Sequence, residues 1–179
     1  MAVQQERHKR AVPPLDKEGL ERLAVNYAGR YAVTRAKLKA YLARKLRERG
    51  WDGEGEPPVD GLVERFAQLG YVDDAAFAAS RAESLSRRGY GVRRVDMALK
   101  VAGIDEADGA AAREHAAAEA WNAALRFAER RRIGPFADSY GERPEREKKL
   151  AAMLRAGHPL ALARKIVASQ PGEFPEADD

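Results

Sequence analysis

A short amphipathic unit occurs three times in this chain and constrains its fold more than any other feature. In each copy, apolar residues spaced four apart are followed by a closing glycine. The copies are Leu38, Leu42 and Leu46 before Gly50-Trp51, Val95 and Leu99 before Gly103-Ile104, and Leu150 and Leu154 before Gly157-His158. Residues four apart share one helix face, and a glycine just past the last turn adopts a positive φ at little cost. The pattern predicts three amphipathic helices, each ended by its glycine.

Cations lead into each unit. The leading groups are Arg35, Lys37 and Lys39 in the first copy, Arg93-Arg94 in the second and Lys148-Lys149 in the third. Repeated helices with cationic surfaces are typical of a repeat protein that holds an acidic partner at several points. They are not typical of an enzyme with one deep pocket.

The composition favours helices around a thin core. Hydrophobic residues make up 45% of the 179 residues, and much of that share is alanine, which buries little area per residue. Alanine, leucine, arginine, lysine and glutamate dominate, and no run of β-branched residues alternates with a period of two. We therefore predict an all-α protein with a slender, elongated core, built from about nine helices in three sets of three.

Turn-forming residues and charge divide the chain into five segments. We expect a disordered basic N-terminus over residues 1–14, three-helix repeats over 15–70, 71–116 and 117–170, and an acidic tail over 171–179. The first helix is expected to be amphipathic and to run from Asp16 through Leu20, Leu23, Val25 and Tyr27 toward Arg30. The pattern over 105–132 leaves two alternatives open, one long helix or two helices with a break near residues 115–120.

Positive and negative segments alternate along the chain, although its net charge is only +4. Residues 34–50 hold seven Lys or Arg and one Glu, whereas residues 51–79 hold seven acidic residues and one Arg. Residues 80–100 and 121–170 are again basic, and residues 101–120 and 171–179 are acidic. The alternation fits either basic helices gathered along one side of the repeats or a solvated surface on which opposite charges pair.

Side chains suited to capping mark two helix starts. Thr34 is a good N-cap, and Val33 and Leu38 stand at the two positions of a hydrophobic staple. The pair Asp73-Asp74 precedes an alanine-rich helix. Paired aspartates also occur in catalytic and metal sites, but at the start of a helix an aspartate caps it and interacts favourably with its dipole. We interpret the pair as a cap.

Few residues suit catalysis or metal binding. The chain has no cysteine, which excludes disulfides, thiolate catalysis and cysteine-zinc sites. His8, His115 and His158 are far apart, and we expect them at the surface or at helix ends rather than on a metal. Gly53 and Gly55 lie in an acidic loop that would repel phosphate. These observations argue against an enzyme and predict that no cofactor or metal is bound.

Targeting signals are also missing from the sequence. No apolar run approaches the roughly 20 residues needed to cross a bilayer, and the basic N-terminus lacks the apolar segment of a secretory signal. We expect a cytoplasmic protein.

Two segments carry longer motifs. The first is Leu69-Gly70-Tyr71-Val72-Asp73-Asp74-Ala75-Ala76-Phe77-Ala78, and the second is Arg88-Gly89-Tyr90-Gly91-Val92-Arg93-Arg94-Val95. They resemble, in this order and spacing, the two signature segments of the RecX family of recombination regulators. The resemblance covers roughly Leu20 to Val167. Departures from the family pattern include Lys37, where a capping glutamate is commoner, and His158, where an aromatic residue is expected after Gly157.

The resemblance implies tandem three-helix repeats in a curved, elongated molecule without enzymatic activity or cofactor. It also implies binding to the RecA recombinase, in the groove of its filament on single-stranded DNA. The expected outcome is reduced filament growth, strand exchange and co-protease activity in DNA repair and the SOS response. The family is cytoplasmic, and we expect this chain to be a monomer.

The repeats and the resemblance together suggest two sets of residues. Those expected to contact the filament are the cations Arg35, Lys39, Arg44, Arg47, Arg93, Arg94, Lys148 and Lys149. Motif residues expected to have structural roles are Leu69, Gly70, Tyr71, Asp73, Asp74, Phe77, Gly89 and Gly91. Within this second set, Gly89 and Gly91 are expected to set the turn that aims Arg93 and Arg94.

A direct DNA-binding protein is the alternative. A three-helix unit with one basic helix can imitate a helix-turn-helix, whose second helix enters the major groove. The basic helices here offer Lys and Arg but hardly any amide side chains, so they suit phosphate rather than base edges. Weak, sequence-nonspecific DNA binding is expected under both hypotheses.

Overall fold

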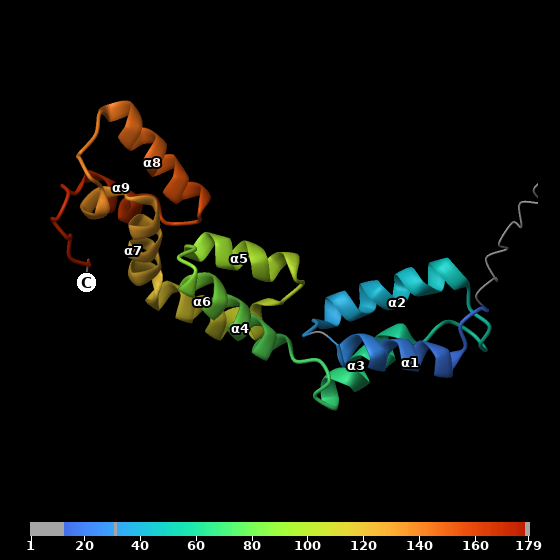
Figure 1. Cartoon of the computed structure of the whole chain (residues 1–179). Coiled ribbons are helices and arrows are strands. Elements are labelled where there is room, and N and C mark those ends of the chain that lie inside the picture. Colours follow the sequence, from blue (N-terminus) through green and yellow to red (C-terminus); the bar gives the residue numbers. More distant parts are fainter. Residues whose placement is uncertain (1–12, 31, 178–179) are drawn as a thin grey trace, which may run out of the picture. The chain divides into compact units, whose positions relative to one another are not determined.

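The computed structural model describes residues 13–30 and 32–177, and these fold into nine α-helices and one short 3-10 helix, with no extended strand. The predicted all-α class is confirmed. The chain forms two compact units, Met1–Val72 and Asp73–Asp179. Figure 1 shows the helices of each unit in chain order.

The first unit is a three-helix bundle of α1 (Lys17–Ala28), α2 (Arg35–Arg49) and α3 (Val59–Gln68). Its core consists of leucines from the three helices together with Phe66 and Val72. Leu38 and Leu42 are fully buried, as their spacing predicts, and Leu46 packs at the edge of the same core. The helix expected from Asp16 is present as α1, capped by Asp16, and in it Leu20 is buried whereas 50% of the Val25 surface is exposed.

Residues near both limits of the described part of the chain pack against the helices. Pro13, placed in the N-terminal segment expected to be disordered, accepts hydrogen bonds from Arg49 Nε at 2.9 Å and Nη2 at 2.7 Å. Residues 1–12 lie outside the described part. In the acidic tail, Gly172 N donates to the Pro135 carbonyl at 2.9 Å, and the Phe174 ring meets the Phe136 ring edge-on.

The second unit contains α4 (Asp74–Arg87), α5 (Val92–Val101), α6 (Glu106–Ala118), α7 (Ala120–Arg131), η1 (Gly134–Phe136), α8 (Arg143–Arg155) and α9 (Leu160–Ala168). One core cluster lies among α4, α5 and α6, and a second lies among α7, α8, α9 and η1 (Figure 1). Small alanines on the facing sides of α4 and α6 are buried, among them Ala78, Ala82 and Ala112. Residues 105–132 form two helices, with the break at Glu119.

The predicted caps are present. The Thr34 hydroxyl accepts from Lys37 N at 3.2 Å, and the Asp73 carboxylate accepts from Ala76 N at 2.8 Å. Asp105 caps α6 in the same way through Asp108 N. Each cap satisfies one backbone donor that the first helical turn leaves unpaired.

The closing glycines have the positive φ that the repeat predicts: 84° at Gly50, 75° at Gly103 and 95° at Gly157. After two of them the next residue turns inward, and its backbone N–H bonds to the carbonyl five residues earlier. Ile104 N donates to Leu99 O, and His158 N donates to Met153 O. This is the Schellman helix ending, which seats an apolar residue just past the glycine.

His158 meets one of the two sequence-based expectations and corrects the other. It lies at the end of α8, but it is not at the surface, because its side chain is completely buried and its ring lies 5.4 Å from that of Phe127. Neither ring nitrogen makes a hydrogen bond of standard geometry. Burial lowers the pKa of His158 to about 4, and the backbone of Gly89 opposes the shift only in part. The ring is therefore neutral near pH 7 and packs as an aromatic side chain.

Candidate functional site

Two glycine backbones touch where α5 begins and α8 ends. Gly91 N donates to the Ala156 carbonyl at 3.0 Å, and Arg93 N donates to the Gly157 carbonyl at 3.1 Å. A Cβ on Gly91 would lie 2.4 Å from the Gly157 carbonyl carbon, so only glycine allows this approach. The contact fixes the start of α5, and with it the first turn that carries Arg93 and Arg94.

Gly89 allows a second close approach. Its φ is 72°, and a Cβ at this position would lie 2.9 Å from Phe127 N and 3.1 Å from Arg130 Nη2. Gly89 thus lets the end of α4 lie directly against α7. The Arg130 guanidinium is brought beside the turn that joins α4 to α5.

Two arginines lie over the Tyr90 ring on this turn, and two more lie close to the turn in the chain or in space. The guanidinium carbons of Arg88 and Arg94 lie 5.5 and 5.8 Å from the centre of the Tyr90 ring. Arg93 and Arg130 complete what we call the arginine cluster: Arg88, Arg93, Arg94 and Arg130. All four are exposed, and none has a carboxylate within 4 Å among residues 13–30 and 32–177. Such a cluster on a fixed turn offers concentrated, uncompensated positive charge.

The predicted cations of α2 are arranged differently. Lys39 pairs with Asp60 at 2.5 Å and Arg44 lies 3.9 Å from Glu48, both at exposed positions. Arg47 is also exposed, whereas Arg35 is half-buried. Exposed pairs of this kind are worth little and can be exchanged for a stronger anionic partner. The α2 surface is therefore a weaker candidate than the arginine cluster.

The two predicted cations of α8, Lys148 and Lys149, lie in different environments. The Lys149 side chain is mostly buried and pairs with Glu145 at 2.8 Å, which holds the pKa of Glu145 below its usual range. The preceding residue, Lys148, is exposed. Lys148 lies eight residues before Ala156, or about 12 Å along α8, so it stands away from the arginine cluster.

The other motif residues occupy mixed environments. Asp74 is buried beside the cap Asp73, and Phe77 packs at the edge of the α4–α6 core. Gly70 has a φ of 73° and ends α3. Leu69 and Tyr71 are largely exposed, although the Tyr71 ring leans on Phe66 with their centres 5.3 Å apart. Packing in a core does not account for these last two side chains.

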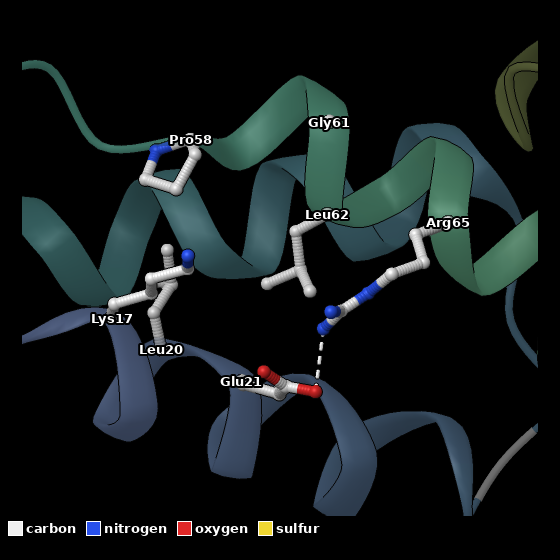
Figure 2. A pocket seen from close by; sticks show the side chains of 7 residues that line it. All are labelled: Lys17, Leu20, Glu21, Pro58, Gly61, Leu62 and Arg65. Atoms are coloured by element: carbon white, nitrogen blue, oxygen red, sulfur yellow. Dashed lines mark ion pairs between the residues drawn. The ribbon is translucent and has the colours of Figure 1, made fainter.

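A small hollow lies in the first unit between α1 and α3 (Figure 2). It has a volume of about 150 Å³ and is lined by Lys17, Leu20, Glu21, Pro58, Gly61, Leu62 and Arg65. The ion pair between Glu21 and Arg65, 2.5 Å long, spans it and lowers the pKa of Glu21. The space is too small for a nucleotide, and its only carboxylate is already paired, so the hollow has no evident chemistry.

No group of three or more potential metal ligands gathers in the described residues. Among the same residues, no helix is both long and apolar enough to cross a membrane. Asp73 of the Asp73-Asp74 pair caps α4, as predicted.

Sequence reasoning missed Arg88, Tyr90 and Arg130 as members of the site. Arg88 and Tyr90 lie within the second motif, and the repeated mixture of Arg with Tyr and Gly there was a usable signal. Arg130 gave none, because it reaches the cluster only through the packing of α7 on Gly89.

The sequence of this chain is similar to those of RecX proteins. Residues 73–112, which span α4, α5 and half of α6, match the family model for RecX, second three-helix domain. The chain is 33% identical over 161 residues to Regulatory protein RecX of Myxococcus xanthus (strain DK1622), covering 85% of this chain and 86% of that protein. The chain belongs to the RecX family. Regulatory protein RecX of Mycobacterium sp. (strain KMS) is a further RecX relative, 32% identical over 151 residues, 82% of this chain and 81% of that one.

A solved RecX structure has the same architecture. The crystal structure of RecX from Lactobacillus salivarius matches with a TM-score of 0.61 at 19% identity, over 84% of this chain and 94% of that chain. At this identity the likeness concerns the fold alone. The family assignment, which the two motifs predicted, is confirmed by the curated relatives, and RecX proteins are named as regulatory proteins.

Proposed function

We propose that this RecX-family protein is a non-enzymatic modulator of RecA that binds the RecA filament on single-stranded DNA and inhibits its extension. Strand exchange and co-protease activity would fall as a consequence. We further propose that it acts in the cytoplasm as a monomer, without a cofactor, and binds free DNA only weakly. Family membership supports the regulatory role, and the arginine cluster supports the acidic partner.

The arginine cluster is the observation that carries the proposal. A filament on DNA presents repeated phosphates and acidic protein surface, and both attract guanidinium groups, which bind oxyanions in bidentate fashion. Because no carboxylate in the described residues neutralises these four arginines, binding sacrifices no existing ion pair. Because the Gly91–Gly157 contact fixes the first turn of α5, little conformational entropy is lost when Arg93 and Arg94 bind.

The remaining predicted cations would add weaker contacts. Arg35, Lys39, Arg44 and Arg47 on α2, and Lys148 and Lys149 on α8, would supplement the cluster where the filament surface reaches them. Lys39, Arg44 and Lys149 would first have to leave their carboxylates. Their individual contributions are therefore expected to be small and sensitive to salt.

The test is the single-stranded-DNA-dependent ATPase rate of the cognate RecA. The wild-type chain should inhibit it at or below stoichiometric concentration. The double variant Arg93→Glu with Arg94→Glu should require at least about tenfold more protein for the same inhibition, because two attractive contacts become repulsive. The matched control is Arg81→Glu with Arg164→Glu, which changes net charge equally at exposed positions of α4 and α9 outside the cluster.

Equal inhibition by the cluster variant and the control would remove the cluster from the site. A wild-type chain that binds free DNA tightly and leaves the ATPase unchanged would favour the DNA-binding alternative. Circular dichroism of both variants checks that they remain folded.

A further inference from the structure

The solvent side of α5 carries apolar residues where a surface helix ordinarily carries polar ones. Met97 is 57% exposed and Val101 is 78% exposed, although Val95 and Leu99 of the same helix are fully buried. A helix at the surface of a small domain usually keeps its apolar residues on one face. Here α5 has a second apolar strip, Met97 and Val101, that stays largely exposed among the described residues.

This strip begins at a cation. Arg93, Met97 and Val101 are spaced four apart, so they follow one another along a single ridge, which we call the α5 ridge. The ridge starts at the arginine cluster and ends at the last residue of the helix. Helices that insert into a groove on another protein use anchors at such spacing.

Asp96 and Lys100, which lie beside the ridge on α5, are already paired within the unit, whereas among the described residues Arg93 and the rest of the arginine cluster are not. The Asp96 carboxylate accepts from Lys100 Nζ at 2.7 Å and from Arg113 Nε at 3.0 Å, which lowers its pKa. Arg93 has no carboxylate within ion-pairing distance in the described part of the chain. A partner therefore meets two apolar side chains and, one turn away, one uncompensated cation.

We propose that the α5 ridge docks into an apolar groove on the protein surface of the RecA filament, with a carboxylate of that surface facing Arg93. This assignment rests on the proposed function. It gives Met97 and Val101 apolar contacts with the partner and Arg93 an ionic contact. Met97 suits such a groove because its flexible side chain adapts to irregular surfaces. A phosphate backbone does not suit the ridge, since Met97 and Val101 would then face hydrated sugar and phosphate groups.

The test replaces the apolar groups by polar ones of similar shape. Met97→Gln with Val101→Thr keeps side-chain size and suits an exposed helix, so folding should be unaffected. Half-inhibition of the cognate RecA ATPase on single-stranded DNA should need about tenfold more of this variant, because the apolar burial of two side chains is lost. The matched control is Val25→Thr with Leu160→Gln, which makes the same kind of change at exposed residues of α1 and α9 and should inhibit like wild type.

Salt dependence distinguishes an apolar contact from a phosphate contact. The slope of log half-inhibitory concentration against log salt should be unchanged in Met97→Gln with Val101→Thr. It should fall in Arg93→Gln, because salt screens the ion pair between Arg93 and a carboxylate. Inhibition within twofold of wild type by the ridge variant would overturn the assignment while leaving the proposed function intact. Equal losses in inhibition and in binding to free single-stranded DNA would also overturn it, in favour of a nucleic-acid contact. A wild-type chain without any effect on the ATPase would contradict the proposed function itself.

Discussion

His158 occupies, in the last repeated unit, the position that Ile104 occupies in the middle one. Each follows a glycine of positive φ, and each backbone N–H bonds to the carbonyl five residues earlier, at 3.1 Å for Ile104 and 3.2 Å for His158. Both side chains are buried. The Schellman ending of α8 thus places an imidazole at a position where such endings usually have an apolar side chain.

This placement predicts that the protein loses stability in mild acid. The pKa of His158 is about 4 when folded, below the value of 6.5 for an exposed histidine. Between these values the unfolded chain binds a proton that the folded chain does not. The free energy of unfolding should therefore be unaffected by this group above about pH 6.5 and fall toward pH 4, by no more than about 3 kcal/mol.

His158→Ile should abolish this pH dependence and leave stability at pH 7.5 equal or higher. Urea unfolding at pH 7.5, 6 and 5, followed by Trp121 fluorescence in a Trp51→Phe background, measures it within the second unit. His115→Gln, at an exposed position of α6, is the control and should keep the wild-type dependence. An unchanged dependence in His158→Ile would show that another group is responsible.

The Gly91–Gly157 contact predicts that a single methyl group is poorly tolerated. In Gly91→Ala the new Cβ would lie 2.4 Å from the Gly157 carbonyl, so α5 and α8 must separate. We expect a loss of about 2 kcal/mol or more in the same urea experiment. Gly61→Ala on α3, where a Cβ meets no atom within 4 Å, should instead gain up to about 1 kcal/mol, measured by thermal unfolding. A Gly91→Ala protein as stable as wild type would contradict the described contact.

Arg132 is the non-glycine residue with positive φ in the described chain, at 51°. It ends α7, and the following residue, Ile133, bonds to Ala128 as Ile104 and His158 do to their carbonyls. Its ion pair with Asp138 is highly exposed and contributes little. Arg132→Gly should therefore raise the free energy of unfolding by about 1 kcal/mol, because it relieves left-handed backbone strain. Lower stability in this variant would mean that the side chain makes a contact of greater value.

Substitutions of Asp73 distinguish a role in capping α4 from a role in the binding site. Asp73→Ala should cost about 1 kcal/mol, because the Ala76 N–H loses its acceptor, whereas Asp73→Asn should retain most of the wild-type stability. Inhibition of the RecA ATPase by Asp73→Asn should match wild type. A variant that is fully stable yet inactive would instead assign the carboxylate to the binding site.

Local features of this protein followed from sequence because they depend on neighbours in the chain. Thr34 and Asp73 cap helices through donors three residues ahead, and Gly50, Gly103 and Gly157 end them with positive φ. Leu38, Leu42, Val95 and Leu99 are buried, as helical spacing requires. The two motifs likewise identified the RecX family, because they are contiguous segments.

Contacts between distant segments could not be predicted in the same way. The sequence alone offered no reason for Arg130 to reach Gly89 or for Val25 to face solvent. Each of these depends on which helix packs against which, and many packings satisfy the same periodic pattern.

By itself, then, the sequence determined the caps and glycine endings of several helices, most of the leucines they bury, and that the chain is an all-α member of the RecX family. The tertiary structure decided which cations pair across helices, as Lys39 does with Asp60 and Arg113 with Asp96. It also decided that Tyr90 lies among arginines, that Gly91 meets Gly157, and that Met97 and Val101 remain uncovered within the described residues. The physical reason is that backbone hydrogen bonding acts over a few residues of chain, whereas packing and electrostatics act through space.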